Sequence, residues 1–225
     1  MAERITFKTT DGVEIVGDWV TAPTTFGAVV LLHMMPLDRT SWRAFQQALS
    51  DRGLASLAID LRGHGESLES SESGKLDYTT FSDEEHQSSL LDAIGAFDWI
   101  RRRGFEPTRI SACGASIGAN LAVQLLLEQP QMSGAALLSP GSNYHGTNAV
   151  SDAASVLDHQ GIWIAASEGD DQESFEAAQA VSDAASSTRK TMVPLKNAGH
   201  GTAMLQSHPE LVANLADWLK ETIQG

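Results

Sequence analysis

The sequence predicts an α/β protein in which a mostly parallel β-sheet carries helices on both faces. Short apolar runs alternate with amphipathic stretches along the chain, as strand–helix units do. Most of the runs are apolar on both faces, which is typical of strands buried in a parallel sheet. The length of 225 residues and the hydrophobic content of 42% suffice for one full core. We therefore expect residues 1–225 to form a single domain.

Eight segments are predicted to be strands. The first two flank Asp11-Gly12, a dipeptide typical of hairpin turns, so they should pair in antiparallel fashion. Pro194 interrupts the last segment and favours the edge of the sheet, because proline lacks the N–H that a central strand must donate. The segments are 3–9, 13–20, 28–32, 54–59, 109–113, 134–138, 162–166 and 191–195.

Helical patterns fill the gaps between these segments. Trp42 and Leu49 share one face of a helix that Gly53 should end. Ser82 and Glu85 have the spacing of a capping box at the start of another. Further helices are expected along Leu90–Ile100, over 116–128 and 172–186, and from Pro209 to Leu219. The Ser- and Glu-rich segment 66–80 is predicted to be a mobile loop.

The charge and the terminal sequence argue against several classes of partner. A formal net charge of −14 disfavours nucleic acids and anionic membrane surfaces. No run approaches the roughly 20 apolar residues of a membrane span. The first residues lack a basic segment followed by an apolar stretch, so the expected location is the cytoplasm. The expected partner is a small molecule, and the sequence leaves a homo-oligomer open.

Ser116 is the strongest candidate for a nucleophile. It follows an apolar strand, opens a helix and stands between Gly114 and Gly118. A serine presented on a sharp strand-to-helix turn brings the residues two before and two after it into close approach, where only glycine avoids a clash. The helix N-terminus also directs N–H groups toward developing negative charge, so we expect Ile117 to supply one oxyanion donor.

A serine hydroxyl needs a base that accepts its proton, and the base needs a carboxylate that orients it. His200, flanked by Gly199 and Gly201 directly after the last predicted strand, is the predicted base. Asp170 is the predicted acid, because it leaves a short loop after the strand 162–166. Asp171 is the second choice and Glu168 the third. His145 is a candidate for the pocket lining, and His33 for a structural hydrogen bond.

These residues together resemble the α/β-hydrolase superfamily over nearly the whole chain. The matching segments are Leu31-Leu32-His33, Asp60-Leu61-Arg62-Gly63-His64-Gly65-Glu66-Ser67, the turn around Ser116, and Gly199-His200-Gly201. The resemblance implies an eight-stranded, mostly parallel sheet whose second strand is antiparallel, and the chain order serine, acid, histidine. It also implies that Met35 supplies the second oxyanion N–H, with Met34 in place of the usual glycine.

The resemblance is to small members of the superfamily. Only residues 139–161 separate the sixth and seventh predicted strands, where larger members insert a helical cap. The chain thus resembles nearly capless carboxylesterases, acyl-protein thioesterases and dienelactone-hydrolase-like enzymes. The last group commonly uses cysteine as nucleophile, whereas the cysteine here, Cys113, precedes the turn on its strand and is expected to be a core residue.

The predicted activity is hydrolysis of carboxylic esters through an acyl-enzyme on Ser116. Thioesters, lactones and amides are alternative substrates for the same residues, and a non-catalytic binding protein of the same fold is the alternative of another class. An apolar substrate pocket is predicted from loop positions. It comprises Met34, Leu37, Tyr144 and Met204. No cofactor and no metal are expected, because no His/Cys cluster has ligand spacing and no phosphate-binding loop is present.

Overall fold

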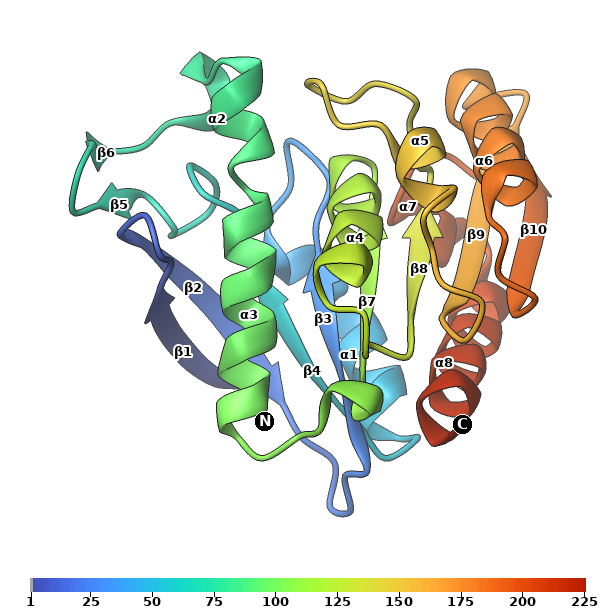
Figure 1. Ribbon diagram of the computed structural model, residues 1–225, viewed down its shortest axis with the longest axis horizontal. Helices are drawn as coiled ribbons and strands as arrows, with labels where there is room; N and C mark the ends of the chain where they lie inside the picture. Colours follow the sequence, from blue (N-terminus) through green and yellow to red (C-terminus); the bar gives the residue numbers. More distant parts are fainter. Residues whose placement is uncertain (1) are drawn as a thin grey trace.

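The computed structural model describes residues 2–225 and contains a ten-stranded sheet with helices on both faces (Figure 1). The strands are β1 (Glu3–Lys8), β2 (Val13–Val20), β3 (Gly27–Leu32), β4 (Leu54–Ile59), β5 (Glu69–Ser70), β6 (Gly74–Lys75), β7 (Ile110–Ala115), β8 (Gly134–Leu138), β9 (Gly161–Glu168) and β10 (Lys190–Lys196). The α-helices are α1 (Arg43–Ser50), α2 (Asp83–Gln87), α3 (Leu90–Arg102), α4 (Ile117–Glu128), α5 (Ala149–Ala153), α6 (Gln172–Ala184), α7 (Ala203–Ser207) and α8 (Pro209–Gln224). The 3₁₀ helices are η1 (Arg39–Trp42), η2 (Tyr78–Thr80) and η3 (Pro107–Arg109).

The strand order confirms the predicted α/β-hydrolase sheet. It runs β10-β9-β8-β7-β3-β4-β2-β5-β6, and β1 pairs with β2. The strands from β10 to β4 are parallel, whereas β2 is antiparallel to both β1 and β4. All eight predicted strands are present, and the strand that contains Pro194 lies at an edge as expected. The two short strands β5 and β6 pair within segment 66–80, for which the sequence predicts a loop.

Helices cover the sheet in two layers (Figure 1). Alternate residues of one strand point to opposite faces, so Val30 and Leu32 of β3 belong to one buried cluster and Val29 and Leu31 to the other. The first cluster packs under α3, α4, α5 and α6, and the second under α1, α7 and α8. Cys113 is fully buried in the second cluster, where burial raises the pKa of its thiol.

The carboxyl ends of the parallel strands lie along the same side of the sheet, and the loops that follow these strands meet there. Leu32, Gly114 and Leu137 occupy paired positions on β3, β7 and β8, so these strands end side by side. Between β8 and β9 the chain forms only an irregular loop and the short helix α5, and therefore little cap covers this edge. Across residues 2–225, no helix combines the length and the apolar character that crossing a membrane requires.

Candidate active site

Ser116 lies on the sharp turn between β7 and α4. Its backbone has φ 55° and ψ −123°, a conformation that is strained for a residue with a side chain. The Ser116 N–H donates to the Leu138 carbonyl at 2.9 Å, which fixes the turn to the end of β8. Ser116 is partly exposed, whereas Ala115 and Ile117 on either side of it are buried. The turn therefore presents the serine alone at the surface.

The two glycines flanking this turn are required by close backbone contacts. A Cβ atom on Gly114 would lie 1.8 Å from the Gly118 carbonyl oxygen. A Cβ atom on Gly118 would lie 2.4 Å from the Leu32 carbonyl oxygen. Both obstacles are backbone atoms, which cannot rotate away as the end of a side chain can. The Gly-x-Ser-x-Gly spacing thus follows from packing between β7, α4 and β3.

Replacing Gly114 by alanine is expected to destabilise the protein by more than about 3 kcal/mol, because the helix must shift away from the strand. Gly74→Ala is the control: nothing lies within 4 Å of its added Cβ, although the positive φ of Gly74 strains an alanine there. Its expected cost is about 1 kcal/mol, from backbone strain alone. Urea unfolding of both variants measures the difference, and equal destabilisation would contradict this explanation of the motif.

The imidazole of His200 is bonded to Asp171, and this corrects the prediction of Asp170. His200 Nδ1 lies 2.8 Å from Asp171 Oδ2. The Asp170 carboxylate instead accepts hydrogen bonds from the Ser167 hydroxyl at 2.5 Å and the Gly199 N–H at 2.8 Å. Asp170 therefore braces the loop that carries the histidine, whereas Asp171 contacts the ring itself.

The length of β9 explains the one-residue error. The strand was predicted to end at Ala166, but it continues to Glu168. Gly169, with φ 96°, then makes the turn, and Asp171 is the N-cap residue of α6. Because the strand ends two residues later than predicted, the carboxylate that reaches His200 comes one residue later in the chain, at Asp171. Glu168, the third candidate, ends the strand and is exposed.

Asp171 is an ionised partner for the imidazole. Its side chain is only 12% exposed, and burial by itself would raise the pKa of the carboxyl group. Hydrogen bonds from His200, Ser139 and Ser174 outweigh burial and hold the pKa of Asp171 below its usual value. A buried carboxylate that stays charged can stabilise an imidazolium on His200.

Tyr144 connects the serine with the histidine and its acid. Its hydroxyl lies 2.8 Å from Ser174 Oγ and contacts the Ser116 hydroxyl. Ser174 Oγ lies 3.5 Å from His200 Nδ1, and the rings of Tyr144 and His200 meet edge to face at 6.4 Å. Burial raises the pKa of Tyr144, so its hydroxyl keeps its proton. Among the described residues no hydrogen bond joins Ser116 directly to His200.

The loop after β3 presents the Met35 N–H. Nε2 of His33 accepts the Leu61 N–H at 3.0 Å, so its Nδ1 carries the proton and donates to the Met34 carbonyl at 3.0 Å. The Leu37 N–H donates to the same carbonyl at 2.9 Å. The C=O and N–H groups of a trans peptide point in opposite directions, so the Met35 N–H is directed away from His33. His33 is fully buried, and burial lowers its pKa to about 4.

The four residues predicted to line a pocket have different positions. Met34 packs against Gly201, where an added Cβ would lie 2.4 Å from the methionine sulfur. Leu37 is 36% exposed, and Tyr144 borders Ser116 as described. Met204 was predicted wrongly: it is fully buried in the core under α7 and α8 and lines no pocket at this edge. Its loop position in sequence gave no sign that α7 turns it inward.

Comparison with known proteins identifies the family. The sequence model of the serine aminopeptidase S33 family matches residues 23–217. The chain belongs to this family. It is therefore a hydrolase of the α/β-hydrolase superfamily, as the quoted motifs predict. A search of curated protein sequences found no match.

Solved structures similar to this S33-family chain share its fold at low sequence identity. An esterase of Pyrococcus furiosus superposes with a TM-score of 0.75 at 18% identity, covering 99% of this chain and 91% of that one. The α/β hydrolase GrgF of Penicillium superposes with a TM-score of 0.82 at 12% identity, covering 100% of both chains. A predicted CIB-like hydrolase of Thermoplasma acidophilum reaches a TM-score of 0.74 at 15% identity, covering 98% of this chain and 99% of that one.

Two serines of this S33-family site were not predicted from the sequence. Ser139, the residue after β8, has φ 50°; its hydroxyl accepts the Gly201 N–H at 3.0 Å and bonds to Asp171. Ser174 joins Tyr144 to His200, as described above. Ser139 could have been predicted as a site residue, because it directly follows the predicted strand 134–138. Ser174 lies inside a helix, and nothing in the sequence marks it.

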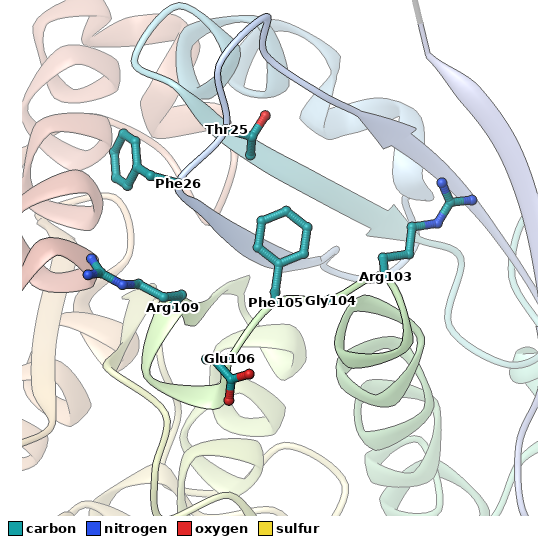
Figure 2. A pocket seen from close by; sticks show the side chains of 7 residues that line it. All are labelled: Thr25, Phe26, Arg103, Gly104, Phe105, Glu106 and Arg109. Carbon is teal, nitrogen blue, oxygen red and sulfur yellow. The ribbon is translucent and has the colours of Figure 1, made fainter.

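Two cavities differ in their relation to this site. One of about 210 Å³ lies beside Met35. Another of about 320 Å³ lies at the opposite edge of the sheet, where η3 precedes β7 (Figure 2). There Arg103 and Arg109 point away from each other, toward Glu3 and the Ile223 carbonyl. Among residues 2–225, no group of three or more His, Cys, Asp and Glu side chains is arranged to hold a metal ion.

Proposed function

We propose that the protein hydrolyses carboxylic esters through an acyl-enzyme on Ser116. The observation that carries this proposal is that a strained, partly exposed serine is linked through Tyr144 and Ser174 to a histidine that is bonded to a charged aspartate. Tyr144 touches the serine and, through Ser174, reaches the imidazole. A nucleophile, a base and a group that orients the base are the three parts that serine acyl transfer needs.

The proposed reaction has two steps on the same residues. The Ser116 hydroxyl gives its proton to Nε2 of His200 as its oxygen attacks the ester carbonyl, and Asp171 stabilises the imidazolium. The imidazolium then protonates the departing alcohol, which leaves an acyl group on the serine. Water attacks this acyl-enzyme with His200 again as the base, and the acid departs.

Two N–H groups are proposed to bind the oxyanion. Ile117 is the first residue of α4, and the first N–H groups of a helix have no partner within it. Its N–H comes from the helix after the serine and that of Met35 from the loop after β3, and together they would bind a negatively charged oxygen. The hydrogen bond between Met34 and His33 supports this by fixing the peptide that carries the Met35 N–H.

The contact between Ser116 and Tyr144 is present in the free enzyme, before a substrate binds. Hydrogen bonds between catalytic groups are often long or misaligned in free enzymes and shorten in the substrate complex. In the substrate complex, a rotation about the Cα–Cβ bond of Ser116 would turn its hydroxyl from Tyr144 toward the imidazole. We propose that Tyr144 thereby acts as a positioning residue for the serine in the free enzyme.

The carboxylates near the site favour an ester over the aminopeptidase substrate from which the family takes its name. An aminopeptidase substrate carries a free ammonium group, which needs an acidic partner. Asp171 is bonded to His200, Asp170 to Ser167 and Gly199, and Asp83 to His145 at 3.1 Å. A neutral ester has no ammonium group and therefore needs no free carboxylate in the site.

Steady-state kinetics with four substrates test this choice. We expect the 4-nitrophenyl ester of butyric acid to show the highest kcat/KM, ahead of a butyryl thioester and γ-butyrolactone. Leucine 4-nitroanilide should be slower than the ester by at least about a hundredfold, since Asp171, Asp170 and Asp83 are already bonded to other groups. Turnover of the anilide within about tenfold of the ester would favour the peptidase.

A further inference from the structure

The cavity beside Met35 opens next to one of the two proposed oxyanion donors. Its walls come from three separated parts of the chain: the loop after β3, the η2–α2 segment and the loop after β8. Met35 therefore belongs both to the lining of this cavity and to the proposed pair of oxyanion donors. The lining residues are Met35, Tyr78, Thr79, Phe81, His86 and His145.

Aromatic rings form most of this cavity. Tyr78 stacks on the buried ring of His64, with the centroids 3.8 Å apart and the planes at 13°. Phe81 meets His86 edge to face at 5.4 Å, and His86 packs on His145 at 3.9 Å. Each ring is thus supported by another, so the walls are already in position before a ligand arrives.

Hydrogen bonds hold the segments that carry these rings. Ser82 and Glu85 form the predicted capping box, which fixes the start of α2 directly after Phe81. The Gln87 side-chain amide donates to the His145 carbonyl at 3.2 Å, and so links α2 to the loop after β8. These contacts fix the two segments that carry Phe81, His86 and His145 relative to each other.

The charges around the cavity disfavour ionic ligands. In the described part of the chain its lining contains no Asp, Glu, Lys or Arg side chain. Burial, followed by the proximity of His145, lowers the pKa of His86, so this imidazole is uncharged at neutral pH. The Asp77 carboxylate is bonded to Thr79 and that of Asp83 to His145. Both partners line the cavity, so a ligand carboxylate would meet like charge.

We propose that this cavity binds a neutral aryl group of the ester substrate. The inference rests on the proposed function, because it places the aryl group relative to an ester held at Ser116. Aromatic walls favour a flat ring through offset and edge contacts, and a thioether such as that of Met35 packs well against it. The volume of about 210 Å³ lies below the roughly 300–1,000 Å³ of pockets for drug-sized ligands, so a single ring fits best.

Two matched pairs of esters test the inference and show on which side of the ester the ring lies. Ethyl phenylacetate against ethyl hexanoate places the ring in the acyl group, and benzyl acetate against hexyl acetate places it in the alcohol. Released acid is followed with a pH indicator, which avoids an aromatic reporter. In one pair the aryl ester should have a kcat/KM about tenfold higher than its alkyl partner.

Variants assign this preference to the cavity. Phe81→Ala is expected to lower the aryl-to-alkyl ratio of kcat/KM by at least about fivefold. Phe105→Ala is the matched control, because Phe105 is also a half-buried phenylalanine but lines the cavity at the opposite edge of the sheet. Phe81→Leu removes the ring while keeping an apolar side chain, and it serves if the alanine variant does not fold.

The outcomes separate this inference from the proposed function. Hydrolysis of the alkyl esters with no aryl preference in either pair would overturn the aryl site and leave the esterase standing. An aryl preference that survives in both Phe81 variants would also overturn the site. Failure of the wild-type protein to hydrolyse any ester of the two pairs would instead count against the proposed function.

Discussion

Replacing Ser116 by alanine is expected to lower kcat/KM for a carboxylic ester by at least about 10³-fold, because no other group takes its place as nucleophile. The position is already strained at φ 55°, and alanine has the same backbone restrictions as serine, so the fold should be kept. The expected result is therefore a folded protein without turnover. Initial rates and circular dichroism on the same preparation measure both parts of it.

Ser151→Ala is the matched control for this variant. Ser151 is an exposed serine in α5 whose hydroxyl donates to the Asn148 carbonyl at 3.0 Å and, among the described residues, makes no hydrogen bond to Ser116 or His200. Its loss should leave the rate of ester hydrolysis unchanged. Esterase activity that persists in Ser116→Ala at a tenth of the wild-type rate or more, about 1.4 kcal/mol of barrier, would mean that another group is the nucleophile.

Asp171→Asn is expected to lower kcat by about 10²–10⁴-fold, while Asp170→Asn should cost less than about tenfold. The amide that replaces the Asp171 carboxylate would have no charge to stabilise an imidazolium, and its NH₂ group would favour the wrong tautomer of His200. The two variants form a matched pair, since they are neighbours, carry the same change and are both hydrogen-bonded to the histidine loop.

The pair decides which aspartate acts on the histidine. Asp170 accepts the Ser167 hydroxyl and the Gly199 N–H, so its amide variant should loosen the loop and leave the charge beside His200 intact. Measurement of kcat and KM together with thermal midpoints separates the two effects. A larger loss of kcat in Asp170→Asn than in Asp171→Asn would restore the assignment made from the sequence.

The strands and helices that form the sheet were predictable because their patterns are strong. Runs such as 28–32 and 134–138 are short and apolar on both faces, which is typical of strands buried on both sides of a sheet. The capping box of Ser82 and Glu85 was visible because it depends on local spacing. The strands β5 and β6 were missed because two residues each are too few to establish an alternating pattern.

The site was predictable only where local geometry fixes it. The turn at Ser116 is specified by two glycines that nearby backbone requires. The choice between Asp170 and Asp171 depends on where β9 ends, and strand boundaries are the weakest part of such predictions. The aromatic cavity depends on contacts between η2, α2 and the loop after β8, which are distant in sequence. Periodicity carries no signal for such contacts.

The most direct test of the nucleophile is covalent labelling with a fluorophosphonate. The reagent phosphonylates a serine that a neighbouring base has activated, so it needs no knowledge of the natural substrate. After digestion, mass spectrometry of the peptide that spans β7 and α4 locates the adduct. We predict a single adduct on Ser116 that is absent from Ser116→Ala and slowed in Asp171→Asn. An unlabelled wild-type protein, or an adduct on any other residue, would contradict the central claim.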